Sequence, residues 1–182
     1  MTETLETSGC ADCSEVVSDR ERPLLIVDAS NVAFGYANSA REAHLSNLLD
    51  VIAQISGTGI ELKIIADASL RHRIDAKKGY ERLVREGTVL QAPAGRPADE
   101  FLTLLARKRR DEGQTVRIMT NDLLREHPEV ESLRATFLIV QPGEVLFDSS
   151  FVELVAKVRH AETPTTAETS PSPHLVLEET SL

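Results

Sequence analysis

The sequence contains few of the residues that mark secreted or membrane proteins. Its 182 residues include two cysteines and no tryptophan, and aromatic residues make up only 4%. No run approaches the roughly 18 consecutive apolar residues of a membrane-spanning helix. Residues 1–22 lack the basic start and the apolar stretch of a secretory signal. We therefore expect a cytoplasmic protein that does not enter a membrane.

Cysteine is too scarce for a complete zinc site within one chain. Cys10 and Cys13 form a single CxxC, which is half of a four-ligand zinc site, and no second pair follows. We interpret the pair as incidental. The alternative is a zinc ion shared between two chains, which would make the protein a homodimer.

Glycine-rich phosphate-binding motifs are also missing. The sequence has no GxxxxGK[ST], no GxGxxG and no G-x-S-x-G. These absences disfavour a nucleotide-binding enzyme and an esterase with Ser30 as nucleophile. A small-molecule phosphatase is disfavoured as well, because no Asp-x-Asp follows the first predicted strand.

The formal net charge of −9 at first argues against a nucleic-acid partner. However, residues 1–22 carry six acidic and two basic side chains, and residues 161–182 carry four acidic and no basic ones. The part between them is almost neutral and has two basic stretches, at residues 68–85 and 107–110. Negative charge is therefore concentrated at the ends, and the middle of the chain can still meet RNA.

The composition of the chain predicts one domain with a tail at each end. Residues 161–174 are rich in Thr, Ser, Pro and Glu and have no periodicity, which is typical of disordered segments. We expect disordered acidic tails at 1–22 and 161–182, where unknown protein partners could bind. The folded domain is expected at 23–160.

Within that domain, predicted strands alternate with predicted helices. Apolar runs indicate strands at 24–28, 61–67, 88–92, 115–119 and 136–140, with a short sixth at 145–147. Helical spacing indicates helices at 45–55, 74–86, 97–112 and 151–158, and a short one after 121–122. This alternation predicts an α/β fold: a Rossmann-like three-layer α/β/α sandwich with a central, mainly parallel sheet of about five strands.

Five carboxylates are expected at the edge of the sheet where the parallel strands end: Asp28, Asp67, Asp99, Glu100 and Asp122. Each taken singly could be a helix cap or a turn residue. Taken together they would repel one another unless a cation lies among them. Oxygen ligands suit Mg²⁺ or Mn²⁺, and no His or Cys is expected nearby to indicate zinc.

Three neutral residues near these carboxylates are candidates for orienting them by hydrogen bonds: Ser30, Asn31 and Thr120. For Asn31 a plain turn residue is the alternative. Asp67 is a weaker candidate for the same supporting role.

Three segments resemble the PIN-like ribonucleases of the NYN group: LLIVDASNVAFGY, GRPADEFLTLLARK and VRIMTNDLLREH. The similarity covers about 24–127 and is greatest to the regnase-type endoribonuclease domain, whose members degrade messenger RNA with a metal ion. The resemblance implies a PIN-type sandwich with catalytic metal ligands at Asp28, Asp99, Glu100 and Asp122. The sequence departs from the regnase pattern in two features. The acidic pair is Asp-Glu rather than Asp-Asp, and no zinc-finger module follows the three segments.

The resemblance also implies a reaction. We expect a Mg²⁺- or Mn²⁺-dependent ribonuclease, a hydrolase that cleaves single-stranded RNA by metal-activated water and leaves 5′-phosphate and 3′-hydroxyl ends. The basic residues predicted to hold RNA are Arg71, Arg73, Lys77, Lys78 and Arg96. A solvated helix face is the alternative for the first four, and an ion pair with Asp99 is the alternative for Arg96. The alternative function is a catalytically weak RNA- or protein-binding module on the same fold.

Overall fold

A computed structural model of the chain describes residues 22–35 and 42–161. The CxxC pair and the two predicted tails lie outside these residues, apart from their innermost positions. No helix among the described residues is long and apolar enough to cross a bilayer.

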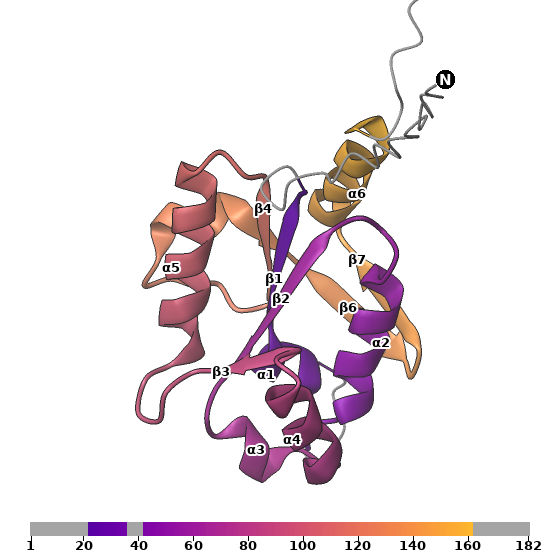
Figure 1. Ribbon diagram of the computed structural model, residues 1–182, viewed down its shortest axis with the longest axis vertical. Coiled ribbons are helices and arrows are strands. Elements are labelled where there is room, and N and C mark those ends of the chain that lie inside the picture. Colours follow the sequence, from indigo (N-terminus) through magenta and orange to yellow (C-terminus); the bar gives the residue numbers. More distant parts are fainter. Residues whose placement is uncertain (1–21, 36–41, 162–182) are drawn as a thin grey trace, which may run out of the picture.

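The centre of the fold is a five-stranded parallel sheet (Figure 1). Its order is β3 (Val89–Gln91), β2 (Glu61–Ala66), β1 (Leu24–Asp28), β4 (Val116–Met119) and β5 (Arg134–Ala135). All four pairings are parallel. Every residue of β1 is buried, as expected for a central strand covered on both faces. The predicted α/β class and the mainly parallel sheet of about five strands are confirmed.

Helices cover both faces of the sheet, which gives three layers. Side chains alternate along β1, so that Leu25 and Val27 join one core and Leu24 and Ile26 join the other. The first core contains residues of α1 (Ala29–Ala33), α2 (Leu45–Ile55) and α6 (Ser149–Ala161). The second contains residues of α5 (Ala98–Asp111) and the 3₁₀-helix η1 (Pro128–Leu133). Figure 1 shows α5 and α2 on opposite sides of β1 and β2.

One predicted strand takes part in a different sheet. The run at 136–140 was expected to extend the parallel sheet, but β6 (Phe137–Gln141) instead pairs antiparallel with β7 (Glu144–Phe147) in a separate hairpin. Phe137 and Ile139 are buried while Leu138 and Val140 are exposed. This one-sided burial fits a strand with solvent on one face and not one inside a covered sheet.

Two predicted helices also differ. No helix directly follows Asp122. The chain makes turns there, with Leu124 at a φ of 47°, and η1 begins only at Pro128. The basic helix expected at 74–86 is present as α4 (Lys77–Arg85), which begins three residues later, and a short helix that was not predicted, α3 (Leu70–Arg73), precedes it. Asp75 lies between them, and its carboxylate accepts hydrogen bonds from the amides of Leu45 and Ala76.

The strand order predicts a binding site between β1 and β4. The chain moves from β1 outward to β2 and β3, and then returns to the other side of β1 to form β4 and β5. Connections therefore leave β1 and β4 toward opposite sides, and ligands of open parallel sheets bind beyond the strand ends at such a point.

Candidate active site

Asp28 lies at this point, as the last residue of β1 and the cap of α1. One oxygen of its carboxylate accepts a hydrogen bond from the amide of Asn31 at 3.0 Å. The other accepts one from the hydroxyl of Thr120 at 3.1 Å. The side chain is therefore held on both oxygens, by residues that follow β1 and β4.

The carboxyl of Asp28 is buried, with 5% of the residue exposed. Burial raises its pKa to about 6, and the charges of Asp99 and Asp67 add to this effect. The hydrogen bonds from Asn31 and Thr120 act in the opposite direction. Among the described residues no Lys or Arg forms an ion pair with Asp28, so its negative charge lacks a cationic partner in the protein.

Asp67 follows β2 and joins the same group of carboxylates. Its oxygens accept hydrogen bonds from the hydroxyl of Ser30 at 3.1 Å and from the amide of Ala98, the first residue of α5, at 2.8 Å. Asp67 therefore connects the helix after β1 with the helix that carries Asp99. The sequence made Asp67 only a weak candidate, but in the structure its charge raises the pKa values of both Asp28 and Asp99.

Asp99 is in the first turn of α5 and is half-buried. Burial raises the pKa of its carboxyl, and so do the charges of Asp122, Asp67 and Glu126. His127 acts in the opposite direction when it is protonated. Within the described part of the chain, the Asp99 carboxylate accepts no hydrogen bond and has no ion pair. The charged form of this carboxylate is therefore partly desolvated without a hydrogen-bond donor or a cation to compensate it.

The loop after β4 brings Asp122 to the group. The hydroxyl of Thr120 accepts a hydrogen bond from the amide of Asp122, whose carboxylate accepts one from the amide of Leu124. The amide of Asn121 donates to the side-chain oxygen of Asn31 at 2.9 Å. The side chains of Ser30 and Thr120 donate to carboxylates of the group, whereas the side chain of Asn31 accepts from Asn121 and only its backbone amide donates to Asp28.

Glu100 has a different environment from the other carboxylates. Both the Nε and Nη2 groups of Arg96 donate to one of its oxygens, so the ion pair of Arg96 is with Glu100 and not with Asp99. Arg96 lies just before α5, four positions ahead of Glu100, and both side chains are solvent-accessible. Such pairs contribute only about 0.3–0.5 kcal/mol, so the contact can exchange readily for a substrate.

Besides Arg96, four basic residues were predicted to hold RNA, and all four are exposed: Arg71, Arg73, Lys77 and Lys78. They lie on α3 and α4, which follow β2 and Asp67. The guanidinium of Arg73 lies over the ring of Phe34, 4.4 Å from its centre. Phe34 directly follows α1, so this contact joins the basic helices to the segment that carries Asn31.

Sequence reasoning missed the residues beyond Asp122. A cavity lies against Asp99 and Asp122, and Arg125, Glu126 and His127 also line it. The expectation that no His lies near the carboxylates was therefore wrong. His127 lines the same cavity as Asp99 because the chain makes turns after β4 instead of continuing as a helix. Its position in the run Leu124–His127, just after a candidate ligand, was the available signal.

The group fits an oxygen-binding cation that takes few protein ligands. Within the described ranges no three His, Cys, Asp or Glu side chains are close enough to form a ready-made ligand set. Mg²⁺ commonly uses one or two carboxylates and completes its shell with water and substrate phosphate. Asp28 is buried and Asp99 is half-buried, and both carboxyls have raised pKa values. They suit this mode of binding because neither has a cationic partner among the described residues.

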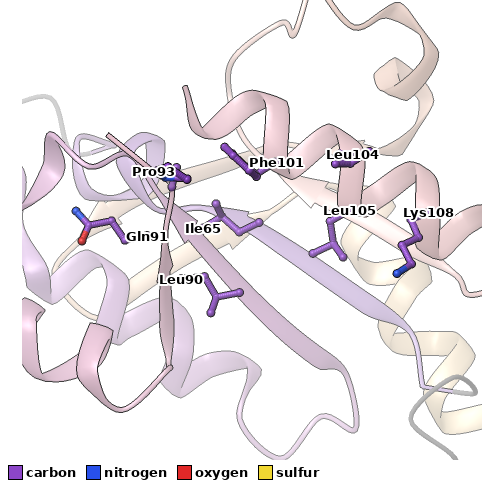
Figure 2. A pocket seen from close by; sticks show the side chains of 9 residues that line it. Ile65, Leu90, Gln91, Pro93, Phe101, Leu104, Leu105 and Lys108 are labelled. Carbon is purple, nitrogen blue, oxygen red and sulfur yellow. The ribbon is translucent and has the colours of Figure 1, made fainter. Parts of the chain in front are cut away.

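A second cavity lies beside β3 and α5, and its lining is mainly apolar. Figure 2 shows it between β3 and α5, lined mainly by apolar side chains: Ile65, Leu90, Phe101, Leu104 and Leu105. Lys108 is the only charged residue that lines it among the described residues. This cavity offers no set of polar groups for phosphate or metal chemistry, unlike the carboxylate edge.

No protein-family model matches the sequence, and no curated protein matches it significantly. Among solved structures, the fold is similar to the crystal structure of a single-substitution mutant of Rae1 (YacP) from Bacillus subtilis. The identity is 18%, the match covers 76% of this chain and 77% of that chain, and the TM-score is 0.41. Similarity at this level does not assign the chain to a family.

Proposed function

We propose that the protein is a Mg²⁺- or Mn²⁺-dependent endoribonuclease that hydrolyses single-stranded RNA at the carboxylate edge of its sheet. The observation that carries this proposal is the placement of Asp99. A half-buried carboxylate with no hydrogen bond, surrounded by other acids, weakens the fold. Residues with perturbed pKa values in a cleft are candidates for function, and a divalent cation would explain why such a cluster persists.

Asp28 and Asp99 would hold the ion directly, and Asp122, the third carboxylate of the group, would bind it through one of the ion's water molecules. When bound, the ion would lower the pKa of a water and neutralise charge on the phosphoryl oxygens. Thr120 and the amide of Asn31 keep the Asp28 carboxylate fixed, since each of its oxygens accepts one of their hydrogen bonds.

Glu100 and Arg96 are proposed to act as a pair. Arg96 would exchange Glu100 for the scissile phosphate, because a guanidinium donates equally well to a phosphate oxygen. Glu100 would then be free to contribute to the site, either as a metal ligand or by accepting the proton of the attacking water. The bond from phosphorus to the 3′-oxygen breaks, leaving a 5′-phosphate and a 3′-hydroxyl.

The basic residues of α3 and α4 would hold the strand on the side of Asp67. Arg71, Arg73, Lys77 and Lys78 are exposed there, and phosphate contacts with Lys and Arg supply most of the affinity for a nucleic acid. The alternative function, a binding module without cleavage, is favoured by one observation: no three acids form a ready-made ligand set among the described residues.

One assay separates the two functions. The full chain is incubated with end-labelled single-stranded RNA and either Mn²⁺ or EDTA, and the ends of the products are mapped. The proposal predicts internal cuts with 5′-phosphates in Mn²⁺ and intact RNA in EDTA. Binding in both conditions without cleavage would establish the binding module instead.

A further inference from the structure

A polar pocket lies beside the carboxylate edge, between α3, α4 and the end of β3. Six residues line it: Arg71, Tyr80, Glu81, Val84, Arg85 and Gln91. Its volume is about 320 Å³, which is ample for a phosphate group with its neighbouring sugar. Gln91 donates a hydrogen bond to the carbonyl of Ala68 at 3.1 Å, which fixes this side of the pocket to the chain that follows Asp67.

Tyr80, which lines the pocket, carries a buried hydroxyl without a hydrogen-bond partner among the described residues. The residue is 1% exposed. Burial raises the pKa of the phenol to about 12, so it remains a donor at neutral pH. Buried hydroxyls in proteins almost always have a partner, and an exception calls for an explanation.

The same hydroxyl connects the pocket to the carboxylates. Its pKa is lowered by the charge of Arg71 and raised by that of Asp67, so both charged groups lie within electrostatic reach of it. Asp67 in turn raises the pKa values of Asp28 and Asp99. The pocket and the candidate active site are therefore adjacent, one cationic and the other anionic.

The cations of the pocket are not used within the protein. In the part of the chain that the structure describes, the guanidinium groups of Arg71 and Arg85 form no ion pair and no hydrogen bond. By contrast, Arg107, Arg109 and Arg110 all pair with carboxylates. Glu81 is the one acidic residue of the pocket, so its lining carries a net positive charge.

We propose that this pocket binds a phosphate group of the RNA strand, held by the guanidinium groups of Arg71 and Arg85 and by the hydroxyl of Tyr80. Guanidinium groups form paired hydrogen bonds with phosphate oxygens, and a neutral phenol adds a donor without adding charge. The proposal rests on the proposed function in taking RNA as the ligand. The phosphate belongs either to an internal phosphodiester near the scissile bond or to a terminal 5′-phosphate.

Binding in EDTA tests the pocket separately from cleavage. The affinity for fluorescent single-stranded RNA is measured at several salt concentrations for the full-length wild type and for two full-length variants. Arg85→Gln is the test variant and Arg82→Gln is the matched control. Arg82 is also exposed on α4 but does not line the pocket. We expect Arg85→Gln to weaken binding and to reduce the slope of log affinity against log salt by about 0.7, the value of one phosphate contact on a single strand. An equal effect of both substitutions would overturn the pocket.

Tyr80→Phe tests the hydroxyl itself. Because this hydroxyl has no partner among the described residues, its removal should leave the melting temperature unchanged or higher and weaken RNA binding several-fold. Unchanged binding, or a lower melting temperature, would show that the hydroxyl does not serve the phosphate.

The source of the phosphate is found by comparing RNA that carries a 5′-phosphate with RNA that carries a 5′-hydroxyl. If Arg85→Gln lowers the affinity for both RNAs, the pocket binds an internal phosphodiester. If it lowers the affinity for the phosphorylated RNA alone, the pocket binds the terminal phosphate. Either result supports the pocket. Binding that depends on Arg85 without cleavage in Mn²⁺ would leave the pocket standing and overturn the ribonuclease. Cleavage in Mn²⁺ together with an affinity that Arg85→Gln does not change would support the ribonuclease and overturn the pocket.

Discussion

The hydroxyl of Thr120 donates a hydrogen bond to the carboxylate of Asp28 across 92 positions of the sequence. The hydroxyl oxygen of Thr120 also accepts a hydrogen bond from the amide of Asp122. One buried threonine therefore sets the positions of two candidate metal ligands relative to each other, at the ends of neighbouring strands β1 and β4.

Replacing Thr120 by Val keeps the shape of the side chain and removes both hydrogen bonds. We expect a loss of stability of about 1–3 kcal/mol, because a buried carboxylate oxygen and an amide lose their partners. The cleavage rate should fall with it, and Thr120→Ser should restore both. Thermal melting and RNA cleavage in Mn²⁺ check the prediction.

Thr136→Val is the matched control, since the hydroxyl of Thr136 donates to Asp148 away from the site. It should lower the melting temperature without slowing cleavage by the folded protein. If Thr120→Val also lowered the melting temperature without slowing cleavage, Thr120 would have only a structural role.

The pKa of Asp28 predicts the pH dependence of stability without metal. The folded-state pKa, about 6, lies above the ordinary value of 3.8, so the folded protein binds the extra proton between these values. The free energy of unfolding in EDTA should therefore rise as pH falls from about 7 to about 4, by up to ~3 kcal/mol from this residue. Asp99 acts in the same direction. Denaturant unfolding at several pH values measures this, and Asp28→Asn should flatten the dependence.

Metal binding should show the opposite trend with pH. The ion needs ionised carboxylates, so protons compete with it near the pKa of Asp28. The affinity for Mn²⁺, measured by calorimetry, is expected to fall as pH drops through about 6. An affinity that did not change between about pH 5 and pH 7 would place the ion away from Asp28.

Arg96→Gln removes one proposed phosphate contact and an exposed ion pair. Because that pair contributes little to stability, the melting temperature should hardly change. The affinity for single-stranded RNA should decrease, with a reduction of about 0.7 in its salt slope. Arg107→Gln, which breaks a similar exposed ion pair with Glu129, is the control and should leave RNA binding unchanged.

Trimming the chain to residues 22–161 tests the acidic terminal segments. They carry most of the formal negative charge of the protein and would compete with RNA for its basic residues. The trimmed chain is expected to fold and to cleave RNA faster than the full chain at low salt, with a smaller difference at high salt. A trimmed chain that does not fold would show that the domain extends beyond these limits.

Much of this fold is visible in the sequence because its elements are locally determined. The apolar run that forms β1 and the helical spacing of α2 depend on neighbouring residues alone, and the parallel topology then brings Asp28, Asp99 and Asp122 to one edge. The hairpin of β6 and β7 was not predicted, because burial of a strand on one face or both is decided by tertiary packing. The approach of His127 to Asp99, the pairing of Arg96 with Glu100 and the unpaired hydroxyl of Tyr80 likewise depend on turns that no local pattern fixes.

The cleavage rate of Asp99→Asn in Mn²⁺, compared with the wild type, tests the central claim most directly. The Asp99 side chain makes no structural hydrogen bond with the described residues, so the substitution should leave the melting temperature in EDTA unchanged or raise it by relieving repulsion. The account predicts a loss of cleavage by orders of magnitude, since a neutral amide cannot balance a divalent cation. Near-normal cleavage by a stably folded Asp99→Asn protein would contradict the assignment of this carboxylate edge as a ribonuclease site.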